Sequence, residues 1–149
     1  MKTGDACPSF ELYNQSGELI KSSTFLGKQK VVIFFYPKDE TPGCTKEACT
    51  FRDRYEDFLE LGCQVIGISS DSVDSHAQFA NRFGFQFTLL ADPEKIVRKA
   101  FNVPGNLFGL LPGRVTYIID STGIVRGIFN SQLNPVGHVN EALKVVSTI

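Results

Sequence analysis

Hydrophobic residues form several short, uninterrupted runs along this chain. Residues 31–36 read VVIFFY, a run of β-branched and aromatic side chains that is typical of a strand covered on both faces in the middle of a sheet. Residues 63–69 (CQVIGIS) predict a second buried strand, and residues 87–90 predict a shorter one. Residues 115–119 and 124–129 flank a four-residue turn that ends in glycine, so together they predict an antiparallel hairpin.

Between these runs, apolar residues recur every three or four positions, which is the spacing of one helix face. Thr41-Pro42 is a typical helix start, because threonine is a good N-cap and proline is tolerated at the first helical position. Gly62 is a typical helix end, so we predict one helix between these points. Its inward-facing side chains are expected to be Ala48, Phe51, Tyr55, Phe58 and Leu59.

Three further helices are predicted from the same signals. One covers residues 72–83, and two follow the cap and proline pairs Asp92-Pro93 and Asn134-Pro135. The helix after Pro93 is expected to bury Ile96, Val97, Ala100 and Phe101. Strands that alternate with helices predict an α/β fold, and 149 residues are the length of one ordinary domain, so we expect a single domain over residues 1–149.

The charge balance and the apolar content narrow the class of protein. Fifteen Lys and Arg residues against sixteen Asp and Glu residues give a formal net charge of −1, so we expect no nucleic-acid binding. The longest apolar run, residues 31–36, is far shorter than the roughly 20 residues that span a bilayer, so we expect no membrane segment. The N-terminal segment MKTGDACPSF is too polar for a secretion signal. We expect a bacterial cytoplasmic protein, or a plastid protein whose transit peptide has been removed.

The four cysteines, Cys7, Cys44, Cys49 and Cys63, are too sparse for a disulfide scaffold and fit a reducing compartment. Cys44 differs from the others because it falls in the first turn of the helix that begins at Pro42. There the free backbone N–H groups and the positive end of the helix dipole favour a thiolate, which is the reactive form. Cys44 is therefore the candidate nucleophile, whereas Cys7 and Cys63 lack such a context and are expected to be structural.

Cys49 follows Cys44 by five residues. In an intact helix, two residues at this spacing lie about 140° and 7.5 Å apart, with Cα atoms roughly 8.7 Å from each other. A disulfide needs a Cα separation below ~7 Å, so the two cysteines can bond only if the helix locally unwinds. The spacing leaves two interpretations open: Cys49 reacts with Cys44 after unwinding, or it is an inert structural thiol.

Other candidate sites have weaker support. Four residues separate the two helical cysteines, so the pair is not the C-x-x-C motif of a disulfide reductase. His76 and His138 lack the close spacing of zinc ligands, so we expect no metal site and interpret both as solvated surface residues. Residues 102–114 (NVPGNLFGLLPGR) form an apolar loop that either packs flat on the domain or lines the active site.

The segment PKDETPGC, from Pro37 to Cys44, resembles the active-site signature Pro-x-x-x-Thr-x-x-Cys of the peroxiredoxins. The longer run FFYPKDETPGCTKEACTFRD, with its second cysteine five residues after the first, resembles the Q-type branch, also called bacterioferritin comigratory proteins. The resemblance continues through VIGIS, FTLL, VPGNLFGLLPGR and VTYIID, so it covers nearly the whole chain. It implies a thioredoxin-like fold with a central mixed sheet flanked by helices, and thiol peroxidase activity without metal, haem or other cofactor.

The resemblance also implies roles for individual residues. Cys44 matches the peroxidatic cysteine, whose thiolate attacks the peroxide O–O bond and becomes a sulfenic acid. Thr41 matches the threonine that hydrogen-bonds the peroxide and the sulfur, and Pro37 matches the proline that shields the pocket from water. Arg114, which would otherwise be interpreted as a surface residue, matches the arginine that holds the thiolate and stabilises the leaving oxygen. Substrate contacts are expected from Thr41, Gly43 and Arg114.

Two more residues complete the implied site. Glu47 matches a frequent acidic position one turn after the cysteine, where it is expected to orient an arginine. Cys49 matches the resolving cysteine, which condenses with the sulfenate to form a transient Cys44–Cys49 disulfide. The resemblance implies thioredoxin as the electron donor and a monomeric protein.

Together these patterns predict a thiol peroxidase that reduces hydrogen peroxide and organic hydroperoxides to water and alcohols. Two alternatives stay open at this stage. One is a thiol-disulfide oxidoreductase that uses the same cysteine pair on protein substrates. The other is a redox-sensing binding module in which the disulfide switches the helix and exposes a partner surface.

Overall fold

One mixed β-sheet organises the computed structural model, which describes residues 1–105 and 113–149. Its strands are β1 (Glu11–Asn14), β2 (Leu19–Lys21), β3 (Lys30–Phe35), β4 (Cys63–Ser69), β5 (Thr88–Ala91), β6 (Val115–Ile119) and β7 (Val125–Asn130). Their order across the sheet is β2-β1-β5-β4-β3-β6-β7. Strands β3, β4 and β5 run parallel to one another, and the other neighbours pair antiparallel.

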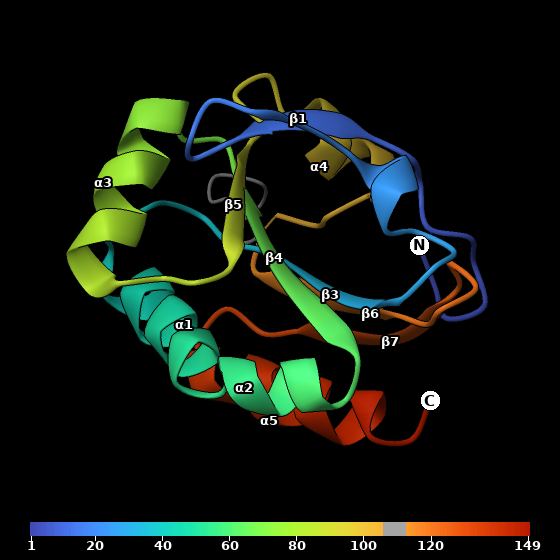
Figure 1. The fold of residues 1–149 in the computed structure, drawn as a ribbon. Coiled ribbons are helices and arrows are strands. Elements are labelled where there is room, and N and C mark those ends of the chain that lie inside the picture. The colour runs from blue at the N-terminus through green and yellow to red at the C-terminus, as the bar shows by residue number, and fades with distance from the viewer. Residues whose placement is uncertain (106–112) are drawn as a thin grey trace.

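Helices cover both faces of this sheet (Figure 1). They are α1 (Pro42–Asp53), α2 (Tyr55–Glu60), α3 (Val73–Phe83), α4 (Ile96–Ala100) and α5 (Pro135–Val146), with a short 3₁₀ turn, η1, at Ser22–Thr24. Helices α1, α2 and α5 lie together below the sheet in Figure 1, and α4 lies on the opposite side. Central strand β3 therefore contributes to two cores: Val32 and Phe34 face one, and Val31, Ile33 and Phe35 face the other.

Phe34 of β3 anchors α1 to the sheet. Its ring stacks on the ring of Phe51 in α1, with centroids 4.4 Å apart. Gly67 on β4 makes room for this ring, because a Cβ at that position would lie 2.7 Å from Cζ of Phe34 and 2.9 Å from Cδ2 of Leu89. Stacked aromatic pairs contribute about 0.5–1.5 kcal/mol beyond the area they bury, so this contact fixes the helix that carries both Cys44 and Cys49.

The structure confirms the predicted strands, the hairpin and the helices at residues 72–83 and after Asn134. The prediction of one helix from Pro42 to Gly62 is wrong, because Arg54 (φ −106°, ψ 8°) separates α1 from α2. This break resets the helical phase, so Leu59 is 39% exposed and does not join the buried face. Strands β1 and β2 were not predicted, because they are short, mostly exposed and without a hydrophobic run.

The helix predicted after Pro93 begins later than expected. Helix α4 starts at Ile96, which is 62% exposed, and Ala100 at its end is also exposed. The carboxylate of Asp92 accepts hydrogen bonds from the backbone N–H groups of Val97 and Arg98. Asp92 therefore stabilises a helix start that lies beyond the proline, and the expected burial of Ile96 and Ala100 is wrong.

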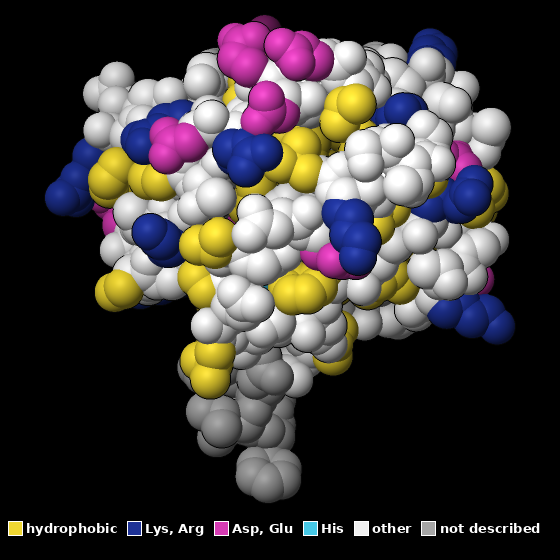
Figure 2. Space-filling model, turned by 90° about the horizontal axis from the view of Figure 1, so that it is seen from below, with side chains coloured by type: hydrophobic (Ala, Val, Ile, Leu, Met, Phe, Trp, Pro, Cys, Tyr) yellow, Lys and Arg dark blue, Asp and Glu magenta, His cyan; other side chains and the backbone are white. Residues whose placement is uncertain are grey.

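The surface formed by α1, α2 and α5 is mixed in charge. Figure 2 shows this face, where Lys and Arg side chains lie among Asp and Glu side chains and small groups of hydrophobic ones. Within the described part of the chain, no helix has the length and apolar content needed to cross a membrane.

Candidate active site

Cys44 lies in the first turn of α1, just after the carboxyl end of β3. Thr41 is the N-cap in extended conformation (φ −81°, ψ 154°), and Pro42 is the first helical residue. The Thr41 hydroxyl donates to the carbonyl oxygen of Lys38 at 2.7 Å, so it closes the preceding turn in place of a side-chain cap bond. The Cys44 side chain is 1% exposed. It sits at the positive end of the helix dipole, which stabilises negative charge at this position.

The sheet brings Arg114 to this sulfur. Val115, the first residue of β6, pairs with Phe35, the last residue of β3, so the residue before Val115 lies beside the start of the loop that leads to Cys44. Arg114 Nη2 donates to Cys44 Sγ at 3.3 Å, and its Nη1 donates to Glu47 Oε1 at 2.7 Å. Burial opposes the charge of this guanidinium, but Glu47 and Cys44 outweigh burial and raise the pKa of Arg114. The arginine therefore stays charged beside the sulfur.

Glu47 lies one turn after Cys44 and is fully buried. Its contact with Arg114 places it where the sequence resemblance expected a carboxylate that orients an arginine. Burial raises the pKa of Glu47 to about 8, and the attraction and hydrogen bond of Arg114 counteract only part of that effect. A carboxyl group with this pKa gains or loses its proton near neutral pH.

Gly43 lies directly under the guanidinium of Arg114. A Cβ at Gly43 would lie 2.9 Å from Nη2 and 3.7 Å from Cζ of Arg114. The backbone φ at this position is not positive, so the glycine is needed for space and not for a left-handed conformation. The absence of a side chain here lets the guanidinium approach Cys44.

Arg98 is a second buried arginine near the site, and it was not predicted from the sequence. Its Nη2 donates to the carbonyl oxygen of Tyr36 at 2.9 Å, and its Nη1 donates to the carbonyl oxygen of Gly113 at 3.0 Å. These are the residues that directly precede Pro37 and Arg114. Arg98 therefore ties together the two segments that lead into the site. Its helix has only five residues, in which apolar and basic side chains are mixed, so no sign of this role is present in the sequence.

Cys49 is half-buried on the same helix as Cys44 and packs against the core on that face of the sheet. Helix α1 is continuous from Pro42 to Asp53, so both cysteines are held in regular helix, and both are free thiols. Burial raises the pKa of the Cys49 thiol, with Arg52 partly opposing this effect. The two thiols thus differ in environment, because a buried arginine contacts only Cys44.

Cys7 and Cys63 lie away from this group. Burial raises the pKa of each thiol to about 12, so both stay protonated and unreactive at neutral pH. Part of the apolar loop predicted at residues 102–114, namely residues 106–112, lies outside the described residues.

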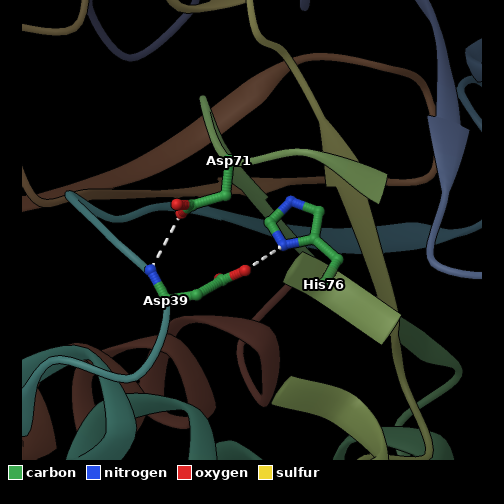
Figure 3. A group of neighbouring side chains, drawn as sticks. All are labelled: Asp39, Asp71 and His76. Carbon is green, nitrogen blue, oxygen red and sulfur yellow. Dashed lines mark hydrogen bonds and ion pairs between the residues drawn. The ribbon is translucent and has the colours of Figure 1, made fainter. Parts of the chain in front are cut away.

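The interpretation of His76 as a surface residue is wrong. His76 is fully buried, with Nδ1 2.7 Å from Asp39 Oδ2 and Nε2 3.0 Å from the carbonyl oxygen of Leu90. Figure 3 shows His76 beside Asp39, whose backbone N–H donates to Asp71 at 2.8 Å. Because hydrogen bonds occupy both imidazole nitrogens, this group ties the loop that carries Thr41 to α3. The sequence did contain a sign of this burial, because His76 precedes the buried residues Phe79 and Ala80 by three and four positions, the spacing of one helix face.

The same interpretation of His138 is also wrong. His138 on α5 is fully buried, with Nε2 2.7 Å from the carbonyl oxygen of Ser131 and Nδ1 2.8 Å from Oγ1 of Thr116. Its Nδ1 also lies 3.5 Å from Glu47 Oε2. His138 precedes the buried Ala142 by four residues, so the helical period already placed it on the inward face.

Comparison with known proteins identifies the family. A profile of the AhpC/TSA family matches residues 3–128. The chain therefore belongs to the AhpC/TSA family.

Relatives within the AhpC/TSA family place the chain more closely. It is 49% identical over 146 residues to a chloroplastic peroxiredoxin Q of Populus jackii, a match that covers 98% of this chain and 68% of that protein. The crystal structure of the peroxidoxin BcpB of Mycobacterium tuberculosis superposes with a TM-score of 0.91 at 40% identity, over 100% of this chain and 98% of that one. The bacterioferritin comigratory protein of Xanthomonas campestris gives a TM-score of 0.84 at 30% identity, over 93% and 90% of the two chains.

These matches confirm the predicted resemblance to Q-type peroxiredoxins. They also confirm the predicted α/β, thioredoxin-like fold with a central mixed sheet flanked by helices. As an AhpC/TSA member of this branch, the protein is an oxidoreductase of the peroxiredoxin type.

Proposed function

We propose that the protein is a thiol peroxidase in which Cys44 attacks the peroxide. The observation that carries this proposal is the contact of Arg114 with Cys44, which puts a fixed positive charge 3.3 Å from a buried sulfur at a helix N-terminus. Both features favour the thiolate, which is the nucleophilic form of cysteine. The bacterioferritin comigratory protein of Xanthomonas campestris has alkyl peroxide reduction activity, which supports organic hydroperoxides as substrates beside hydrogen peroxide.

In the first step, the Cys44 thiolate attacks one oxygen of the peroxide. A sulfur–oxygen bond forms, the O–O bond breaks, and the leaving oxygen takes up a proton to become water or an alcohol. Cys44 is oxidised to a sulfenic acid, and the peroxide is reduced. Arg114 stabilises the negative charge that develops on the leaving oxygen, because its guanidinium is already fixed beside the sulfur by Glu47.

The segment between β3 and α1 supplies the other peroxide contacts. The proton of the Thr41 hydroxyl is engaged by the carbonyl of Lys38, so the oxygen lone pairs of Thr41 are the groups that accept a hydrogen bond from a peroxide O–H. Gly43 leaves room for the peroxide and Arg114 on the same side of the helix. Pro37, half-buried two residues after the end of β3, shields the sulfur from water.

In the second step, the Cys49 thiol attacks the sulfenic acid. A disulfide between Cys44 and Cys49 forms and water leaves. Because α1 is continuous across both cysteines, its first turns must unwind before this bond closes. A dithiol reductant, for which we propose thioredoxin, then reduces the disulfide to two thiols and completes the cycle.

The catalytic cycle bears on the quaternary state, and the relatives bear on the compartment. Both cysteines belong to one helix of one chain, so the cycle needs no second subunit, and we propose a monomer. The plant relatives are named chloroplastic, and the compared structures from Mycobacterium tuberculosis and Xanthomonas campestris are bacterial, which supports a plastid or a bacterial cytoplasm as the site of action. Sedimentation of the reduced and oxidised protein should give the mass of one chain in both states.

Single-cysteine variants test the proposed chemistry. Cys44→Ser should abolish the reaction with peroxide, whereas Cys49→Ser should retain the first oxidation and lose recycling by thioredoxin. Mass spectrometry of the peroxide-treated Cys49→Ser protein should find sulfenic or sulfinic acid on Cys44. Cys63→Ser is the matched control, because Cys63 is a buried thiol away from the site. Peroxide consumption by Cys44→Ser at the wild-type rate would refute the assignment.

A further inference from the structure

One oxygen of the buried Glu47 carboxyl group has no obvious partner. Oε1 accepts a hydrogen bond from Arg114, but Oε2 has no hydrogen-bond partner among the residues that the structure describes. A buried polar atom without a partner destabilises the folded state, and an ionised one does so more strongly. The nearest charged or titratable group on this side of Glu47 is His138, with Nδ1 at 3.5 Å.

The hydrogen bonds of His138 fix the position of its ring proton. Nε2 lies 2.7 Å from the carbonyl oxygen of Ser131, which can only accept, so Nε2 carries a hydrogen. Burial lowers the pKa of His138 to about 4, with the Ser131 carbonyl partly opposing this effect, so the ring is neutral at pH 7. Nδ1 therefore carries a lone pair, which accepts the hydrogen bond of the Thr116 hydroxyl at 2.8 Å and also faces Glu47 Oε2 at 3.5 Å.

A lone pair that faces a carboxylate oxygen is repulsive, whereas a proton on that oxygen removes the repulsion. The neutral imidazole does not supply that proton, because its one N–H already points at Ser131. We propose that Glu47 enters the peroxidase reaction as a neutral carboxylic acid, with the proton on Oε2, the oxygen that faces Nδ1 of His138. This inference rests on the proposed function and concerns the charge of the same site.

The protonation state of Glu47 decides how many buried anions the positive charge of Arg114 must compensate. Among the described residues, the titratable groups that contact Glu47 are Arg114 before β6 and His138 on α5, and Arg114 also contacts Cys44 on the helix of Glu47. If Glu47 were ionised, Arg114 would have to compensate two buried anions, the carboxylate and the thiolate. With Glu47 neutral, the whole positive charge serves the thiolate, and the buried group has no net charge.

Ionisation of Glu47 at alkaline pH should slow the oxidation of Cys44. As the pH rises through the titration of Glu47, a second anion forms beside Arg114. This anion competes with the Cys44 thiolate and with the leaving oxygen for the guanidinium. The rate constant for oxidation of Cys44 is therefore expected to fall on the alkaline side, by roughly tenfold for each pKa unit of coupling between the two sites.

Infrared difference spectroscopy of the reduced wild-type protein tests the protonation state directly. The protein labelled with ¹³C-carboxyl glutamate should show an isotope-shifted band of a protonated carboxylic acid at pH 6, and this band should disappear with a midpoint near pH 8, the pKa of about 8 that burial imposes on Glu47. Glu47 is the only buried glutamate of the described chain, so the band identifies it without a variant. Absence of this band at pH 6 in a protein that still reduces peroxide overturns the inference and leaves the proposed function intact.

Stopped-flow oxidation of Cys44 across pH 6 to 9.5 gives a second test. In Glu47→Gln, the amide oxygen can accept from Arg114 and the uncharged amide N–H₂ can face the His138 lone pair without repulsion, so this variant imitates the neutral acid at every pH. For Glu47→Gln, the rate constant for oxidation of Cys44 at pH 9.5 divided by that at pH 7 should be roughly tenfold larger than for wild type. This variant should also react faster at pH 7 than Glu47→Ala, which has no side-chain oxygen to hold Arg114. Glu60→Gln, at an exposed position on α2, is the control for loss of one carboxylate. Equal pH profiles for Glu47→Gln and wild type overturn the inference.

Discussion

Arg114 Nη2 lies 3.3 Å from Cys44 Sγ, although 70 positions separate the two residues in the chain. The contact exists because β6 pairs antiparallel with β3, which sets the residue before β6 beside the start of the loop to α1. The approach is close because Gly43 carries no side chain and because Glu47 holds the other end of the guanidinium. A local helix start and a long-range strand pairing thus meet at one sulfur.

Removal of Arg114 should slow oxidation of Cys44 strongly. In Arg114→Ala, no fixed positive charge stabilises the thiolate or the leaving oxygen, and we expect a loss of about 10²–10³-fold in the rate constant with peroxide. Arg114→Lys should recover only part of that rate, because a single ammonium group cannot contact Glu47 and Cys44 at once. Stopped-flow kinetics measure both variants, and full activity of Arg114→Lys would contradict the two-partner geometry.

Gly43→Ala should lower the peroxidase activity without lowering the stability of the fold. The new Cβ would push the guanidinium of Arg114 away from Cys44, and we expect the rate of peroxide reduction to fall roughly tenfold for each 1.4 kcal/mol of lost stabilisation in the transition state. Alanine is favoured over glycine inside a helix by about 0.5–1 kcal/mol, so the midpoint of urea unfolding should not fall. Lys46→Ala, an exposed substitution on the same helix, is the control. Wild-type kinetics in Gly43→Ala would show that the guanidinium adjusts freely.

Oxidation should reduce the helical signal in circular dichroism. Both cysteines lie in continuous helix, where residues five apart have Cα atoms roughly 8.7 Å from each other, beyond the reach of a disulfide. Addition of one equivalent of peroxide to the reduced protein should therefore lower the helical signal, and the change should be absent in Cys49→Ser. A mapped Cys44–Cys49 disulfide with an unchanged spectrum would contradict the proposed unwinding.

His138 should make the protein less stable in mild acid. Burial lowers its pKa from 6.5 to about 4, so the unfolded chain binds a proton below pH 6.5 that the folded protein does not take up until about pH 4. Its contribution to the free energy of unfolding is thus present above pH 6.5 and is lost as the pH falls to 4. Urea denaturation at pH 7 and pH 4.5 should show a larger drop for wild type than for His138→Gln. NMR titration that placed the midpoint of this imidazole at 6.5 would contradict the prediction.

Local sequence patterns determined much of this protein. The buried run before Pro37, the cap and proline before Cys44 and the helical period of α3 and α5 are features of a few consecutive residues, and the structure follows them. Such signals act within one turn or one strand, because backbone conformation and periodic burial depend on near neighbours. They placed Cys44 at a helix start without any knowledge of the rest of the chain.

Tertiary structure alone decided which polar residues are buried. His76 meets Asp39 from 37 positions away, and Arg114 meets Glu47 from 67 positions away. Burial of a charged or titratable group is favourable only when a distant segment supplies its partner, and the composition of either segment by itself does not reveal that partner. The sequence therefore determined where the candidate nucleophile lies. The placement of β6 and α5 beside α1 decided which charged and titratable side chains surround it.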